Sequence, residues 1–381
     1  MLPLISLRRC NPPRPAHRAD RGVRALLLAV LVLAAAAGAP RTLSAQTPGA
    51  SYARSIAAIA RRQAADDSVA LPGARSILLT TGAPTARVIV LLHGLTDSPR
   101  QFEALAYLLH ADGNNVYVPR LPQHGLRGGT VAALSALTAA QLRGVADSVV
   151  NEARGLGDSV VVVGLSMGAT VGAWVAQQRQ VARVVLIAPA IEPGLIPSLL
   201  DRPLIGLADR LPSITRQSRP DTARPDREVG FNSRATAEIF ELGSSILDQA
   251  AHDAPATRDI VVLLNAGDRT VKESAAEALA RNWSRHGATV SMFELPDSLR
   301  LPHNIIDPIR GRAGGEAVLG LLRELAYGWP PTALVRSISA THSQRSDSVG
   351  STRVARTAGA KALAAVAASR NSAAAANNGA L

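Results

Sequence analysis

The chain has 381 residues and a net charge of +12, and 47% of its residues are apolar. This is enough apolar material for a buried core in one large domain or two small ones. The charge excess lies at the ends, because residues 1–45 carry a net +6 and residues 330–381 a net +5, against +1 for residues 46–329. A nucleic-acid binder carries its basic patch on the folded domain, so this distribution argues against that class.

A basic and then apolar segment opens the chain. Arg21 and Arg24 precede a thirteen-residue apolar run at 25–37, and small residues follow it. This order is typical of a secretory signal peptide, and the run is shorter than the ~20 residues of a membrane span. We therefore predict a signal peptide at 1–45, export to the periplasm or the medium, and no stable membrane span after cleavage. An uncleaved anchor in the inner membrane is the alternative. The single cysteine, Cys10, leaves no disulfide or thiolate metal site downstream.

Apolar runs alternate with amphipathic segments between residues 87 and 327. Short runs rich in Val, Ile and Leu predict strands buried on both faces, and apolar residues spaced three or four apart predict helices. The expected strands are 87–94, 114–120, 159–164, 181–190, 258–268 and 288–296. The expected helices are 98–113, 138–156, 167–178, 272–286 and 311–327. Strands that alternate with helices predict an α/β fold with a mostly parallel central sheet and helices on both faces.

A serine stands between two glycines where the predicted strand VVVV at 160–163 gives way to a helix. A tight strand-to-helix turn needs small neighbours, which Gly164 and Gly168 supply, and it lifts the serine hydroxyl out of the sheet. The amide dipoles of the following helix favour negative charge beside Ser166. We therefore predict that Ser166 is a nucleophile; a serine that only caps the helix is the alternative.

A serine needs a base to become a nucleophile, and in this turn context the chain order is serine, acid, histidine. Asp268 directly follows a predicted strand and is expected to be the acid, with a helix-capping role as the alternative. His303 comes after the last strand and before the last helix, where the base is expected. His286 is the rival, but it precedes a strand and so belongs to the opposite edge of the sheet.

The segment His93-Gly94-Leu95 follows the first predicted strand. Gly94 allows the backbone to bend so that the N–H of Leu95 faces the site, where it would form an oxyanion hole with the N–H of Met167. The rings of His93 and His124 are expected to brace loops. None of these groups requires a metal or a cofactor, and we expect neither.

The residues from 330 to 381 are rich in Ser, Ala, Arg, Thr and Asn. They contain no capped amphipathic pattern, so we predict a low-complexity, largely disordered basic tail. The sequence carries no indication of the oligomeric state.

Taken together, the motifs resemble those of the α/β-hydrolase superfamily, and within it those of bacterial carboxylesterases and monoacylglycerol lipases. HGLTDSPRQFEALAYLL is similar to their HGFTGSP-type loop, VPRLPQHG to their VPRLxGHG block and GLSMGAT to their nucleophile turn, and NAGDRTV and HNIID continue the order. The likeness covers residues 76–327. Asp97 stands where the family usually has Gly, and Pro302 where Gly or Ser is more usual.

The resemblance implies an α/β-hydrolase domain at 46–329 with a cap inserted at about 192–255. It also implies a serine hydrolase whose substrate is a small-molecule acyl ester, and apolar pieces in the insertion would suit an acyl chain. Two other hypotheses stay open. One is a serine aminopeptidase, which would need a charged group for the substrate amine; the other is a catalytically silent hydrolase fold used for binding. The acidic residues of the cap that could serve an aminopeptidase are Glu192, Asp201, Asp209, Glu238 and Glu241.

Overall fold

The computed structural model describes residues 48–194, 212–218, 225–227, 230–306 and 315–328, all of which lie in the unit Thr47–Leu381. The predicted signal peptide at 1–45, the predicted tail at 330–381 and much of the predicted cap lie outside these ranges. Across the described segments, no helix combines the length and the hydrophobicity needed to cross a membrane.

Seven strands of the described residues form one sheet in the order β1-β3-β2-β4-β5-β8-β9. The β1–β3 pair is antiparallel, and every other pair in this sheet is parallel. The strands are β1 (Ile77–Leu79), β2 (Thr85–Leu92), β3 (Asn115–Val118), β4 (Gly157–Leu165), β5 (Arg183–Ile187), β8 (Asp259–Asn265) and β9 (Thr289–Leu295). A separate antiparallel ribbon joins β6 (Thr215–Gln217) to β7 (Gly230–Asn232). The predicted mostly parallel sheet is confirmed.

The valine run of β4 is buried on both of its faces. Val160 and Val162 belong to one apolar cluster, whereas Val161 and Val163 belong to the other. Successive side chains of a strand point to opposite faces, so a run without polar residues fits only a strand covered by helices on both sides. Burying each of these side chains contributes about 1.5–3 kcal/mol.

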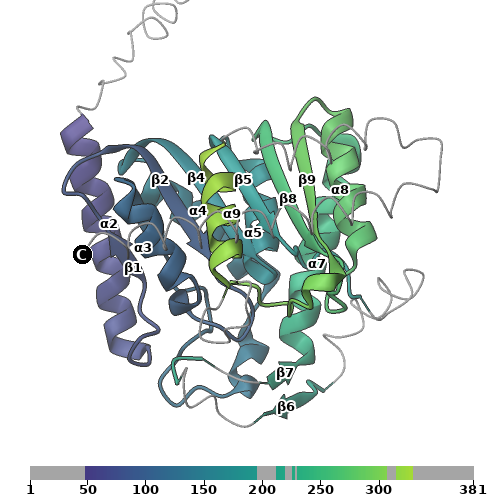
Figure 1. The fold of residues 1–381 in the computed structure, drawn as a ribbon. Coiled ribbons are helices and arrows are strands. Elements are labelled where there is room, and N and C mark those ends of the chain that lie inside the picture. Colours follow the sequence, from purple (N-terminus) through teal and green to yellow (C-terminus); the bar gives the residue numbers. More distant parts are fainter. Residues whose placement is uncertain (1–47, 195–211, 219–224, 228–229, 307–314, 329–381) are drawn as a thin grey trace, which may run out of the picture. The chain divides into compact units, whose positions relative to one another are not determined.

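Helices cover both faces of the sheet, as predicted (Figure 1). α3 (Glu103–Ala111) and α9 (Gly315–Tyr327) cover one face, and α4 (Ala139–Ala153), α5 (Met167–Gln178) and α8 (Glu273–Arg285) cover the other. The predicted helix at 167–178 matches the bounds of α5. The predicted helix at 98–113 instead begins as a short 3₁₀ helix, Pro99–Phe102, before α3.

Two long helices are absent from the sequence-based prediction. α2 (Pro48–Val69) has few large apolar residues, and it is held to the domain by ion pairs of Arg62 with Glu152 and of Asp66 with Arg120, each 2.8 Å long. α7 (Ser233–His252) falls within the range predicted for the cap. Its buried residues nevertheless join the same apolar cluster as α4, α5 and α8. This part of the insertion is therefore a helix of the main layer.

Candidate active site

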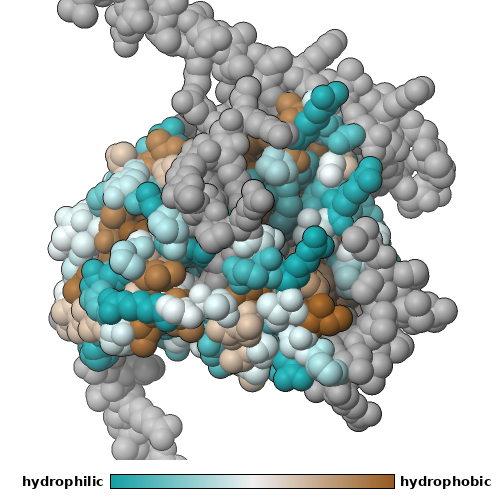
Figure 2. All heavy atoms as spheres, turned by 90° about the horizontal axis from the view of Figure 1, so that it is seen from below, coloured by the Kyte–Doolittle hydropathy of each residue, from teal (hydrophilic) through white to brown (hydrophobic). Residues whose placement is uncertain are grey.

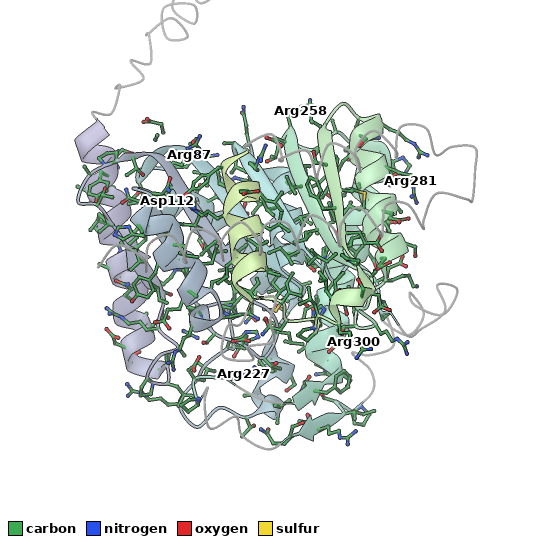
Figure 3. All side chains as sticks on the ribbon, in the orientation of Figure 1. Arg87, Asp112, Arg227, Arg258, Arg281 and Arg300 are labelled. Atoms are coloured by element: carbon green, nitrogen blue, oxygen red, sulfur yellow. The ribbon has the colours of Figure 1, made fainter. Side chains whose placement is uncertain are left out.

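The predicted site residues lie at one edge of the sheet, in loops, at the end of β4 and in the first turn of α5. This edge is formed by the carboxyl ends of β2, β4, β8 and β9. Arg87 and Arg258 mark the opposite edge in Figure 3, whereas Arg300 and Arg227 lie near the edge with the candidate site. Figure 2 views the domain from the site's side, and the coloured residues there are a mixture of hydrophilic and hydrophobic ones. In open parallel sheets this edge is where ligands bind.

Ser166 occupies a strained turn between β4 and α5. Its backbone angles are φ 55° and ψ −115°. A non-glycine residue in such a region costs about 1–3 kcal/mol and persists only where its surroundings hold it. The N–H of Ser166 donates to the carbonyl of Ile187 at 2.9 Å, and the Ser166 carbonyl accepts from the N–H of Thr170 at 2.9 Å. Strand β5 and the first turn of α5 therefore hold the strained residue from both sides.

The two glycines around Ser166 are required by close backbone contacts. A Cβ atom added at Gly164 would lie 2.2 Å from the carbonyl oxygen of Gly168. A Cβ added at Gly168 would lie 2.0 Å from the carbonyl oxygen of Leu92, at the end of β2. Helix α5 thus crosses its own strand and the neighbouring strand at distances that only glycine allows. The spacing of Gly164 and Gly168 around Ser166 in the sequence is explained by this close approach of α5 to the two strands.

The side chain of Ser166 does not cap the helix that follows it. Ser166 stands at the N-cap position of α5, but its hydroxyl makes no capping hydrogen bond. The hydroxyl of Thr170 lies at hydrogen-bond distance from two carbonyls, 2.9 Å from that of Ala190 and 3.2 Å from that of Ser166. The alternative of a serine that only caps the helix is therefore wrong.

Asp268 and His303 meet across the ends of β8 and β9. The Nδ1 of His303 lies 2.5 Å from Oδ2 of Asp268, whose side chain is 2% exposed. The other carboxylate oxygen of Asp268 accepts from the N–H of Thr270 at 2.8 Å. Burial opposes ionisation of Asp268, but the hydrogen bond and the charge of His303, together with the bond from Thr270, outweigh it and lower the pKa of the carboxyl.

The His303–Asp268 bond fixes the tautomer of the histidine. A carboxylate only accepts, so Nδ1 carries the proton and Nε2 carries the lone pair. Nε2 is buried and has no hydrogen-bond partner among the described residues. Asp268 is not a helix cap, since the N-cap residue of α8 is Lys272. The structure thus brings together the acid and the histidine that the chain order predicts.

His286, His93 and His124 have structural contacts. His286 ends α8, and its Nε2 lies 3.3 Å from the carbonyl of Ala251. The Nε2 of His93 accepts from the N–H of Leu121 at 3.0 Å, so this ring braces the loop after β3. His124 is fully buried, its ring meets that of His93 edge-on at 5.2 Å, and burial lowers its pKa to about 4.

The loop after β2 lies directly beside the serine turn. A Cβ added at Gly94 would be 3.7 Å from Cβ of Ser166, and the Gly94 N–H donates to the side chain of Gln101 at 2.8 Å. Leu95 follows Gly94, and Met167 is the first residue of α5, where N–H groups lack partners within the helix. Met167 thus directly follows Ser166 in the chain, and Leu95 follows the glycine that lies beside it.

Sequence reasoning missed a set of residues that joins the loops around the site. The buried carboxylate of Asp97 accepts from Asn304, next to His303, at 3.4 Å and pairs with Arg227 at 3.8 Å. Asp226 is fully buried, accepts from the hydroxyl of Ser98 and pairs with Arg100 at 3.6 Å. The segment 225–227 of the predicted cap therefore contacts the loop after β2. The one sign of this contact in the sequence is Asp97 itself, which stands where similar proteins usually have Gly.

Three acidic residues of the predicted cap have partners in the domain. Glu192 pairs with Lys272 at 3.2 Å, and Glu241 pairs with Arg143 at 3.5 Å. Glu238 accepts from the N–H of Ala139 at 2.7 Å, at the start of α4. Asp201 and Asp209 lie outside the described residues.

Comparisons with known proteins agree with this fold. The model of the alpha/beta hydrolase family matches residues 89–299 of the chain. Among solved structures, a metagenome-derived lipolytic enzyme from work on LipS and LipT is 20% identical with a TM-score of 0.52, covering 68% of this chain and 98% of that one. The monoacylglycerol lipase of Paleococcus ferrophilus is 17% identical with a TM-score of 0.50, covering 66% and 98%. No curated protein matches the chain. The family match, together with the parallel sheet and the glycine-flanked serine turn, places the chain in the alpha/beta hydrolase family.

Proposed function

We propose that the chain is a serine hydrolase that cleaves carboxylic esters of small acyl compounds, such as acyl glycerols. The observation that carries the proposal is the bond between His303 and Asp268 at the sheet edge where Ser166 occupies its strained turn. This pairing gives the histidine the tautomer that a general base needs. The lipolytic activity named for the two similar structures is in keeping with an ester substrate.

The site residues divide the proton transfer, charge stabilisation and orientation of the proposed reaction among them. His303 Nε2 takes the proton of the Ser166 hydroxyl as its oxygen attacks the ester carbonyl, and the N–H groups of Leu95 and Met167 bind the resulting oxyanion. His303 then gives the proton to the leaving alcohol, which leaves an acyl-serine. A water molecule, deprotonated by His303, attacks the acyl-serine. The bond to Ser166 then breaks as His303 returns the proton to its Oγ, which releases the acid and restores the serine. Asp268 keeps the ring oriented and stabilises its charged form.

Among the described residues, the contacts of the acidic side chains in the predicted cap favour an ester over a peptide substrate. An aminopeptidase of this scaffold would need a carboxylate available for the substrate amine. The three described candidates already bind a cation or a helix N-terminus. The strained backbone of Ser166 costs free energy, and such strain is typical of active sites. It therefore favours catalysis over binding alone.

The proposal includes the organisation of the chain. Residues 1–45 are a cleaved export signal, residues 46–329 the hydrolase domain and residues 330–381 a basic tail. The insertion at about 192–255 forms a cap only before α7, because α7 packs in the main helical layer. N-terminal sequencing of the protein recovered from the periplasm or the medium of its host tests the signal. An N-terminus near residue 46 is expected, whereas membrane-bound protein that retains residues 25–37 would support the uncleaved anchor.

The first experiment measures hydrolysis of p-nitrophenyl esters from short to long acyl chains. Ser166→Ala should lower kcat by several orders of magnitude. Ser159→Ala is the matched control, since Ser159 lies on β4, the strand that leads to Ser166, seven residues earlier, and its hydroxyl donates to the carbonyl of Ala86. The control should keep full activity. If the wild type were inert towards esters and towards a fluorophosphonate probe, the binding hypothesis would replace the proposal. Release of N-terminal residues from peptides, with no ester turnover, would instead favour the aminopeptidase.

A further inference from the structure

The backbone just before His303 is hydrogen-bonded to the side chain of Asn265. Pro302 precedes His303 and has no N–H to donate, so its backbone can form hydrogen bonds only through its carbonyl group. The side chain of Asn265 supplies the donor. Its Nδ2 donates to the carbonyls of Leu301 at 3.1 Å and of Pro302 at 3.2 Å.

The same asparagine also holds the turn that carries Asp268. Asn265 is the last residue of β8 and is 3% exposed. Its carbonyl accepts from the N–H of Asp268 at 2.8 Å, and its side-chain oxygen accepts from the N–H of Gly267 at 3.4 Å. One buried residue is thus bonded to both segments whose side chains meet in the His303–Asp268 pair.

We propose that Asn265 is a positioning residue that sets the geometry between Asp268 and His303. This inference rests on the proposed function and deepens it. Asn265 acts through the two loops: its backbone fixes the start of the acid turn, and its side chain ties the peptide before the histidine to that turn. Without the side-chain bonds, the ring is free to shift relative to the carboxylate and to Ser166.

The chain offers a matched control in Asn115. This asparagine is also buried, and its Nδ2 donates to two backbone carbonyls, those of Ala83 at 2.8 Å and Leu156 at 2.7 Å. Asn115 begins β3, at the edge of the sheet opposite the candidate site. A change at either asparagine removes the same kind of bonds, but only one of the two changes touches the His303 loop.

The experiment compares Asn265→Leu with Asn115→Leu, because leucine has nearly the shape of asparagine but no donor. Urea unfolding should show a loss of stability in both. Only Asn265→Leu should lower kcat, by about 10- to 100-fold, with KM little changed, since a displaced catalytic group costs rate rather than binding. In an Asp268→Ala background, the further loss from Asn265→Leu should shrink to less than about threefold, because residues that act as a unit are not additive.

A spectroscopic signal tests the inference independently of turnover. The low-field proton resonance of His303 Nδ1–H, assigned by its loss in Asp268→Ala, should broaden or vanish in Asn265→Leu and persist in Asn115→Leu. If Asn265→Leu does not fold, Asn265→Ser takes its place, since serine is too short to reach both carbonyls. An unchanged kcat and resonance in the folded variant would overturn the inference, as would an undiminished loss in the Asp268→Ala background. Failure of the proposed function is distinguishable, because the wild type itself would then be inert or as active as Ser166→Ala.

Discussion

Replacing Gly168 with alanine should destabilise the domain far more than the same change at Gly172, although both glycines lie in α5. An added methyl group at Gly168 meets two backbone oxygens, at 2.0 Å from Leu92 and 2.7 Å from His93. Strand and helix must separate by more than about 1 Å to restore normal contact, at a cost at or above the upper end of the ~1–3 kcal/mol typical of overpacking. At Gly172 the nearest atom is a side-chain methyl of Leu186 at 3.1 Å, which can rotate away.

The pair of variants isolates the contact between helix and strand. Both gain about 1 kcal/mol of helix propensity, and both reduce the entropy of the unfolded chain equally, so these contributions cancel in the comparison. We expect Gly172→Ala to stay within about 1 kcal/mol of the wild type and Gly168→Ala to lose about 3 kcal/mol or more. Urea unfolding followed by circular dichroism measures both midpoints. Equal midpoints would refute the reasoning that backbone proximity dictates this glycine.

Three further predictions concern charged and titratable groups. Asp268→Asn should leave the fold intact and lower kcat by about 10⁴-fold, because an amide no longer fixes the proton on Nδ1 of His303; a kcat within tenfold of the wild type would contradict the assigned role. The pKa of His124 lies at about 4 in the folded protein, against ~6.5 when unfolded, so the unfolded chain binds more protons between these values. Stability should therefore fall by up to about 3 kcal/mol as the pH is lowered from 6.5 to 4, and urea unfolding of His124→Asn should lack this part of the fall. A double-mutant cycle with Asp97→Asn and Arg227→Gln should give a coupling of about 1–3 kcal/mol in the free energy of unfolding, since both side chains are less than a tenth exposed; additive effects would show that segment 225–227 is not held by this pair.

Local patterns predicted most elements of the sheet and of the turn around Ser166. The run at 160–163 has no polar residue, and a strand with that composition is stable only between two helical layers. Gly164 and Gly168 mark a crossing that leaves no room for a side chain. The start of α5 follows from the same tight turn, because the helix begins directly after the strained residue Ser166.

Elements stabilised by long-range contacts were not predictable in the same way. α2 lacks a strong apolar stripe, and the residues that hold it, Glu152 and Arg120, are far away in the chain. α7 was taken for part of a cap because apolar segments in an insertion carry no sign of which surface they cover. Its place against α4, α5 and α8 depends on packing that forms only when the chain folds.

The candidate site also combines features that local sequence patterns predict with contacts that form only in the folded chain. The sequence by itself determined the order of Ser166, Asp268 and His303 and the strand ends after which they stand, because period and glycine spacing are local properties. Only the tertiary structure decided which histidine meets Asp268, and that Asn265 supports the loop after β9. A hydrogen bond between residues 35 positions apart depends on the order of strands in the sheet. No periodicity in the chain encodes that order.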